Sequence, residues 1–280
     1  MIKINEIVRN MEKYGVPANT IDKDWILSHI LGGLYGGELS SYLIFKGGTC
    51  LKKCYFEGYR FSEDLDFTLS KEYSIKDIKK EVNIALELVN KHTDILFQKP
   101  QVENNYFQEK LVGIRMKIPY WGANHRGIPT DRAWPTRFII DITFNEIICL
   151  SPLEKTILHT YSDNLLSNSI ISYSLEEIFA EKMRSLLQRR YTAPRDYYDL
   201  WSIISKHSFT DWMLIKNTII EKCKFKNITF DSLDSFFLDE FKNNAIKAWN
   251  SSLANHLRET PDPIKVINEL YRDLSESLQF

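Results

Sequence analysis

Two short stretches, Phe45-Lys-Gly-Gly-Thr49 and Ser62-Glu-Asp-Leu-Asp-Phe67, say the most about the architecture of this chain. The first follows the apolar run 42–45, which predicts a strand, and precedes a predicted helix over 50–55. The second lies in residues 61–69, where apolar and polar residues alternate as in a half-buried strand. The order strand, Gly-Gly-Thr turn, helix, strand indicates a core that combines helices with a sheet.

The side chains of Asp64 and Asp66 are expected to form a metal site. Successive side chains of a strand point to opposite faces, so these two carboxylates share one face while Leu65 and Phe67 point toward a core. Two neighbouring carboxylates repel each other unless a cation lies between them. A hard divalent cation such as Mg²⁺ is the simplest candidate, because it binds one or two carboxylates together with substrate phosphates.

The turn formed by Gly47, Gly48 and Thr49 is expected to bind phosphate. Two glycines between a strand and a helix let the backbone approach a ligand closely, and the N-terminus of the helix attracts anions. The hydroxyl of Thr49 could add a further contact. Together with the carboxylate pair, the turn predicts a site for a metal-bound triphosphate.

A third carboxylate, Asp141, is expected to complete the metal site. It lies in the apolar stretch 138–144, which predicts another strand, and burial of an unpaired carboxylate is costly. Three carboxylates, Asp64, Asp66 and Asp141, would suit two metal ions acting in an in-line phosphoryl transfer. Each feature by itself also has an ordinary structural explanation: a solvated acidic pair, a plain turn, or a buried partner in a salt bridge.

A second informative block begins with an amphipathic helix predicted over 174–191. Lys182 and Arg189 lie seven residues apart on the flank of its apolar stripe. Such a set of cations could hold the β- and γ-phosphates of a nucleotide.

The block continues after Pro194, where a new helix places Asp196 and Asp199 on one face. An acidic pair of this kind could belong to the same site as the cations. The structural alternative is that Asp196 only complements the helix N-terminus and that Arg195 forms an i,i+4 ion pair with Asp199.

The whole chain predicts an α+β fold with a mixed sheet, N-terminal helices and a helical C-terminal half. A strand is expected over 111–118 and a loop over 119–136, where Gly, Pro, Asn and Asp gather. The predicted helices cover 1–38 in two pieces, 75–91, 152–160, 174–191, 194–206, 210–221, 237–256 and 262–277. The expected domains are residues 1–150 and residues 151–280, the second completing the active site.

Composition narrows the class of protein. The 280 residues contain 36 Lys and Arg against 37 Asp and Glu, and a net charge of −1 argues against a uniformly basic nucleic-acid binder. The absence of a signal-peptide pattern and of a long apolar run predicts a cytoplasmic protein without membrane contact. Four cysteines are too few for a disulfide framework. The six histidines show no clustered pattern, which argues against a metal-dependent phosphohydrolase.

Taken together, these motifs resemble the AbiEii/AbiGii-type nucleotidyltransferase toxins, within the polymerase β-like nucleotidyltransferase superfamily. The similarity covers residues 20–205 and is most specific over 45–67 and 182–199. One departure is the stretch between Thr49 and Asp64, which is longer than in many superfamily members. The matching pieces are Phe45-Lys-Gly-Gly-Thr49-Cys-Leu51, Arg60-Phe-Ser-Glu-Asp-Leu-Asp-Phe67, Asp141 with its strand, Glu181-Lys-Met-Arg-Ser-Leu-Leu-Gln-Arg189 and Arg195-Asp-Tyr-Tyr-Asp-Leu200.

The resemblance implies a polymerase β-like core that transfers a nucleotide from an NTP to an acceptor hydroxyl, with Mg²⁺ or Mn²⁺. It further implies a toxin of a toxin–antitoxin or abortive-infection system for phage defence, with a cognate antitoxin as partner and the tRNA 3′ end, or another RNA, as acceptor. Metal binding falls to Asp64, Asp66 and Asp141, and catalysis also to Lys182 and Asp199. The residues assigned to nucleotide binding are Lys46, Gly47, Gly48, Thr49, Ser62, Lys182, Arg189, Arg195 and Asp196.

Two alternatives stay open at this point. The acceptor could be a protein or a small molecule, because the metal motif does not encode the acceptor surface. The chain could also be a binding module without catalysis, although the three carboxylates and Lys182 are all present and speak against it.

Overall fold

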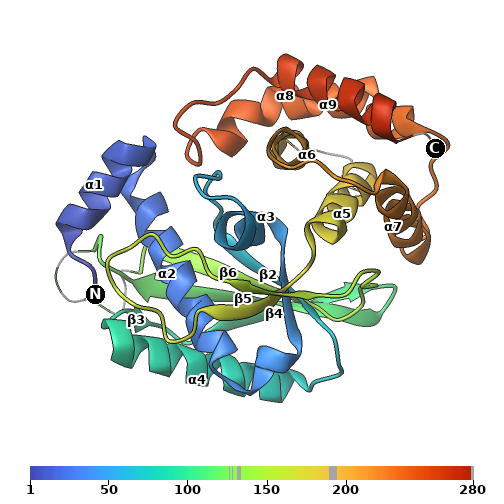
Figure 1. Cartoon of the computed structure of the whole chain (residues 1–280). Coiled ribbons are helices and arrows are strands. Elements are labelled where there is room, and N and C mark those ends of the chain that lie inside the picture. Colours follow the sequence, from blue (N-terminus) through green and yellow to red (C-terminus); the bar gives the residue numbers. More distant parts are fainter. Residues whose placement is uncertain (126, 128, 131–133, 189–193, 279–280) are drawn as a thin grey trace. The chain divides into compact units, whose positions relative to one another are not determined.

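The chain forms two compact units (Figure 1). The computed structural model describes residues 1–280 except 126, 128, 131–133, 189–193 and 279–280. The first unit comprises Met1–Glu146 and Pro152–Tyr173, and the second comprises Ile147–Ser151 and Ser174–Phe280. The short segment Ile147–Ser151 belongs to the second unit because Glu177 accepts hydrogen bonds from the backbone N–H groups of its Cys149 and Leu150, at 3.1 and 2.9 Å.

A mixed sheet of eight described strands is the centre of the first unit. The strands run in the order β3-β5-β6-β2-β1-β8-β7, and β4 pairs with β5. The pairs β2–β6 and β1–β8 are parallel, and the other pairs are antiparallel. The strand bounds are β1 (Leu43–Lys46), β2 (Asp64–Leu69), β3 (Leu96–Phe97), β4 (Gln101–Phe107), β5 (Lys110–Trp121), β6 (Thr136–Thr143), β7 (Leu153–Thr156) and β8 (Ser169–Ser172).

The helices of the first unit are α1 (Ile4–Tyr14), α2 (Ala18–Tyr35), α4 (Ile75–Thr93) and the short α3 (Gly47–Cys50), which continues as a π-helical turn over Leu51–Tyr55. Helix α2 is buried along most of its length and packs against α4. The two helices approach closely at Gly33, where a Cβ atom would lie only 2.8 Å from Cγ2 of Val89. Gly15, with φ 64°, ends α1 in the left-handed conformation that glycine adopts without strain.

The second unit is helical. Its helices are α5 (Leu175–Gln188), α6 (Pro194–Lys206), α7 (Trp212–Phe225), α8 (Asp239–Leu253) and α9 (Pro263–Ser277). Helix α5 packs on α6 and α7, and α6 packs on α8 and α9. Local sequence sets two of the starts: Asp211 and Asp262 cap α7 and α9 through their side chains, and Pro263 takes the first position of α9. None of the described helices is both long and apolar enough to cross a membrane.

The predicted α+β fold with a mixed sheet is confirmed, and several elements differ from expectation. Residues 152–160 are not a helix: residues 153–156 form β7, which pairs with β8. Strand β4, with Tyr106 and Phe107 exposed near its end, was not predicted, because it lacks a buried face. Strand β5 extends to Trp121, so the loop expected over 119–136 begins later. These strands form because a neighbouring strand supplies their hydrogen bonds, which the local sequence does not reveal.

Candidate active site

Strand β2 presents Asp64 and Asp66 as the sequence predicts. Both carboxylates are half-buried, whereas Leu65 and Phe67 between and beyond them are fully buried. The alternation of a strand therefore places the two acidic side chains on one face and the two apolar side chains in the core.

A row of charged residues crosses four neighbouring strands at this point. Lys46 of β1 pairs in register with Asp66 of β2, Asp66 pairs with Asp141 of β6, and Asp141 pairs with Arg115 of β5. Residues directly paired across strands point to the same face of a sheet. The charges of the row run positive, negative, negative, positive, so each end of the acidic pair is flanked by a cation.

Asp141 is engaged by a residue that sequence reasoning missed. Two N–H groups of the Arg115 guanidinium contact the Asp141 carboxylate: Nε donates to Oδ1 at 2.9 Å and to Oδ2 at 3.2 Å, and Nη2 donates to Oδ2 at 2.8 Å. These hydrogen bonds raise the pKa of Arg115 above its usual value. The structural alternative, a partner in a salt bridge, is therefore the role that the structure shows for Asp141. No local signal identifies Arg115, because it lies 26 residues away in an exposed strand position.

Within the described residues, the oxygens of Asp64, Asp66 and Asp141 do not all lie within 4.8 Å of one another. The role of all three as metal ligands stays a prediction. Asp64 and Asp66 remain adjacent on one face, and Asp141 lies beside Asp66 in the next strand.

The Gly-Gly-Thr turn follows β1 and fits tightly against β2. Gly47 has φ +80°, and a Cβ atom on it would lie 2.5 Å from Oδ2 of Asp66. A Cβ atom on Gly48 would lie 2.7 Å from Nη2 of Arg60 and 3.2 Å from Oγ of Ser62. Gly47 is therefore favoured by its conformation, and a side chain at either position would displace the side chains packed against the turn. The turn brings backbone N–H groups, a carboxylate and a buried guanidinium together.

Thr49 makes a hydrogen bond that stabilises the turn. Its hydroxyl donates to the backbone carbonyl of Asp64 at 2.5 Å, and the side chain is fully buried. Thr49 therefore ties the turn to the start of β2 and fixes the position of the carboxylates.

The second unit brings Lys182 of α5 together with Asp196 and Asp199 of α6. The ammonium of Lys182 lies 3.1 Å from Oδ1 of Asp196 and 2.6 Å from Oδ2 of Asp199. All three side chains are buried, and Asp199 is fully so. The three predicted residues thus form one cluster, in which the lysine is held by two carboxylates.

Arg195 has another visible role. Its Nε donates to the carbonyl oxygen of Ser252 at 3.0 Å, and its Nη2 lies 2.9 Å from Nε2 of His256. Arg195 therefore links α6 to the end of α8, and its assignment to nucleotide binding stays a prediction. Arg189, the other predicted phosphate ligand, lies outside the described residues.

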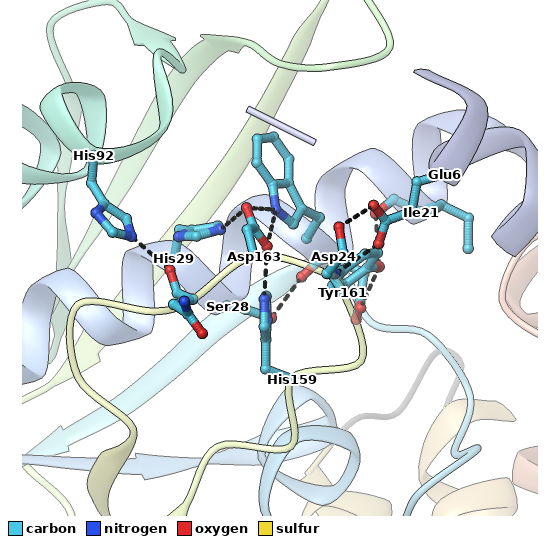
Figure 2. A network of polar contacts seen from close by, with 12 residues as sticks. Glu6, Ile21, Asp24, Ser28, His29, His92, His159, Tyr161 and Asp163 are labelled. Carbon is cyan, nitrogen blue, oxygen red and sulfur yellow. Dashed lines mark hydrogen bonds and ion pairs between the residues drawn. The ribbon is translucent and has the colours of Figure 1, made fainter. Parts of the chain in front are cut away.

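The expectation that the histidines do not cluster is wrong. His29 of α2 and His159 of the loop between β7 and β8 lie on either side of Asp163, as Figure 2 shows. The two histidines are 130 positions apart in the sequence, so only the folded chain reveals the cluster. The argument against a metal-dependent phosphohydrolase rested on the lack of a histidine cluster and therefore no longer holds.

Two cavities of about 760 Å³ each lie in the second unit. They share the segment of residues 227–231 as a wall, and Cys223 lines one of them. None of the predicted site residues that the structure describes lines either cavity.

A known protein family matches most of this chain. The sequence model of the family described as "Nucleotidyl transferase AbiEii toxin, Type IV TA system" matches residues 29–277. The match includes the region after residue 205, where no motif is recognisable. No curated protein sequence gives a significant match.

The structural comparisons agree in fold. MenT4, a nucleotidyltransferase toxin from Mycobacterium tuberculosis H37Rv, has a TM-score of 0.69 at 16% sequence identity, covering 99% of this chain and 90% of that chain. A protein from H. pylori provisionally assigned as a nucleotidyltransferase has a TM-score of 0.50 at 15% identity, covering 92% of this chain and 96% of that chain. At such identities the likeness shows a shared fold.

Proposed function

Because the chain belongs to the AbiEii family of nucleotidyltransferase toxins of toxin–antitoxin systems, we propose that it transfers a nucleotide from an NTP to an acceptor hydroxyl at a site built on Asp64 and Asp66. One observation carries the proposal: the two carboxylates share a face of β2, directly against the Gly47 turn. Membership of the family supports the reaction class, and this geometry supports the choice of residues.

Asp64 and Asp66 have the properties that a hard divalent metal ion requires. Both offer carboxylate oxygens, the ligands that Mg²⁺ and Mn²⁺ prefer. The space beside Oδ2 of Asp66 would be filled by any side chain at position 47, where the chain has glycine. When bound, the ion would neutralise and orient the triphosphate.

The turn and its surroundings provide positive charge for the phosphates. The backbone N–H groups of Gly47 and Gly48 are proposed to bind phosphate oxygens, since no side chain hinders their approach. Arg60 places its guanidinium against Gly48 from the buried side. Lys182 is assigned to the triphosphate through its place in the family motif, with its ammonium oriented by the two acidic residues of α6.

The reaction forms a bond between the acceptor oxygen and the α-phosphorus and breaks the bond between that phosphorus and the bridging oxygen, so that pyrophosphate leaves. The hydroxyl proton must pass to a base. We assign this task to Asp141, because it lies beside Asp66 in register and Arg115 fixes the orientation of its carboxylate. Oδ1 of Asp141 accepts one hydrogen bond from Arg115 and keeps a second lone pair.

For the acceptor we propose RNA, and among RNAs the tRNA 3′ end, with a cognate antitoxin protein as the partner that restrains the enzyme in the cytoplasm. The support is the resemblance of the motifs. A protein or a small molecule as acceptor is distinguished by the experiment below.

The test incubates purified protein with Mg²⁺, each α-labelled NTP in turn, and total RNA, and resolves the products on a denaturing gel. We expect a labelled band of tRNA size. Asp64→Ala should lower the rate by about 10³-fold or more, because the residue binds the metal and triphosphate of the transition state. Circular dichroism should show an unchanged fold.

Glu72→Ala is the matched control, because Glu72 is an exposed acidic residue shortly after the same strand. It should transfer label at the rate of the unmodified protein. Label in protein or in small molecules after addition of cell lysate would replace the RNA acceptor but retain the enzyme class. Full activity of Asp64→Ala would refute the assignment of the site.

A further inference from the structure

The loop between β7 and β8 folds against helix α2 and brings His159 and Asp163 to His29 (Figure 2). All three belong to the first unit. One ligand atom from each, two imidazole nitrogens and a carboxylate oxygen, lie within 4.8 Å of one another. In the described part of the chain this is the one group of at least three His, Cys, Asp or Glu residues with that property.

The donor atoms of the group are close together. Nε2 of His29 lies 3.0 Å from Oδ2 of Asp163, and Nε2 of His159 lies 2.9 Å from Oδ1. Tetrahedral ligands at about 2.0–2.2 Å from an ion lie about 3.3–3.6 Å apart, so a bound ion requires these contacts to lengthen by a few tenths of an ångström. Trp25 donates from Nε1 to the same carboxylate at 3.0 Å and thereby orients it.

Of the three side chains, that of Asp163 is the most exposed to solvent. The side chain of His29 is fully buried and that of His159 is 9% exposed, whereas that of Asp163 is 28% exposed. An ion could therefore enter beside the carboxylate and keep a water molecule as a further ligand, as ions bound by three protein ligands do.

We propose that His29, His159 and Asp163 bind a divalent transition-metal ion of the zinc class. Two imidazoles and one carboxylate suit zinc and its neighbours in the first transition row, whereas Mg²⁺ prefers a shell of oxygen atoms. This site is thus chemically distinct from the carboxylate pair on β2, and it does not depend on the proposed nucleotidyl transfer.

The surroundings predict an exchangeable ion. In the hydrogen-bonded tautomer, Nε2 of each histidine carries the proton that it donates to Asp163, and metal binding moves that proton to Nδ1 or releases it. Nδ1 of His29 and Nδ1 of His159 are buried and have no hydrogen-bond partner in the described structure. Metal-binding histidines without such a partner bind roughly 10–100-fold more weakly. Chelators should therefore remove the ion readily.

A bound ion would stabilise the folded state of the first unit. It would join α2 to the loop between β7 and β8, and the next residue of that loop, Asn164, is already held by His92 of α4 through a 2.6 Å hydrogen bond from Nε2 to the carbonyl oxygen. We therefore expect a metal-dependent rise in the unfolding temperature of the full chain.

The test uses tag-free protein treated with a chelator and then titrated with Co²⁺, whose visible absorption reports the number and type of its ligands. We expect one equivalent to bind, to be displaced by Zn²⁺ and to raise the unfolding temperature. His159→Gln and Asp163→Asn should each weaken binding by roughly 100-fold or more while keeping a hydrogen-bonding side chain. These two variants replace partly exposed ligands, which avoids disturbing the buried His29.

His92→Gln is the matched control, because His92 is a neighbouring histidine outside the donor group. It should bind Co²⁺ as the unmodified protein does. Absence of a Co²⁺ spectrum, or a spectrum that persists in both His159→Gln and Asp163→Asn, would overturn the proposal. The cluster would then be a hydrogen-bonded network only.

Discussion

At the scale of single residues, the first unit neutralises its buried carboxylates in different ways. Asp24 lies 2.7 Å from the ammonium of Lys53 and accepts a hydrogen bond from the Tyr161 hydroxyl at 2.9 Å. Burial alone would raise the pKa of Asp24, but the lysines and the hydroxyl bring it below its usual value. Asp22, two positions earlier, is paired with no lysine or arginine among the described residues, and Nδ1 of His125 lies 3.6 Å from its Oδ2. Burial raises the pKa of Asp22 to about 7, although backbone N–H groups partly offset the shift.

The raised pKa of Asp22 predicts a pH-dependent stability. Because the folded state binds this proton more tightly than the unfolded state, the free energy of unfolding should fall as pH rises from about 4 to about 7. Asp22→Asn removes this loss. The variant should exceed the unmodified protein by about 2–4 kcal/mol at pH 8 and match it at pH 4. Urea unfolding at the two pH values measures the difference.

Asp94→Asn serves as the control for this prediction. Asp94 is exposed, and its φ of 62° is a conformation that asparagine also adopts. Its unfolding free energy should follow that of the unmodified protein at both pH values. An Asp22→Asn variant that is equally destabilised at pH 4 and pH 8 would show that ionisation of Asp22 does not limit stability.

Arg115 is predicted to position Asp141 during transfer. Arg115→Gln removes the charged hydrogen bonds to the carboxylate, and the rate of nucleotide transfer should fall by about 10–100-fold, since small displacements of reacting groups cost that much. Arg115→Lys should recover part of the rate, because it restores the charge without the paired geometry. Rates at saturating NTP over a range of pH measure the effect.

Lys117→Gln is the comparison for Arg115. It lies two residues along the same strand, and its ammonium pairs with Glu103 of β4 at 2.5 Å. It should leave the rate unchanged. Equal losses in Lys117→Gln and Arg115→Gln would point to a general effect of charge on the sheet and against positioning.

At the scale of elements, the contact between α2 and α4 depends on the lack of a side chain at Gly33. Gly33→Val would place its Cβ 2.8 Å from Cγ2 of Val89 and 3.2 Å from the carbonyl oxygen of Ala85. The helices would have to separate, so we expect a loss of about 1–3 kcal/mol in the free energy of unfolding. Thermal or urea unfolding tests this.

Gly37→Ala is the corresponding control, because the nearest atoms to its added Cβ lie at 3.6 Å, an ordinary contact distance. It should change the unfolding free energy by less than about 1 kcal/mol. Similar losses in the two variants would mean that backbone flexibility, and not the helix contact, explains the requirement for glycine.

At the scale of the whole molecule, contacts between segments far apart in the sequence hold the first unit together. Lys53 follows the Gly-Gly-Thr turn, Asp24 lies in α2, and Tyr161 lies in the loop between β7 and β8. All three side chains are buried, so this network joins three distant parts of the chain.

Removal of one charge from this network should be costly. Lys53→Met leaves Asp24 buried without its cation, and we expect a loss of about 3–5 kcal/mol in the free energy of unfolding. Adding Asp24→Asn should restore much of it. Lys23→Met, which breaks the more exposed pair with Glu63, should cost less than about 1 kcal/mol. Equal losses for Lys53→Met and Lys23→Met would contradict the importance of the buried pair.

The sequence by itself determined the parts that depend on neighbours along the chain. These parts are the alternation around Asp64 and Asp66, the Gly-Gly turn and the amphipathic periods of α4 and α5. Each can be predicted from a few neighbouring residues, because it depends only on the side-chain period of a strand or helix or on the backbone freedom of glycine. The α+β fold class and the family could therefore be predicted from residues such as Lys182 and Asp199 before any contact was known.

Only the tertiary structure decided which distant groups meet. Residues 153–156 form a strand and not the expected helix, because β8 supplies their hydrogen-bond partners. The tertiary structure gave Asp141 a guanidinium from β5, and it brought His29 to His159 across more than a hundred residues. Pairing across strands and packing of loops on helices are set by the global minimum of free energy, to which a short stretch of sequence contributes only a part.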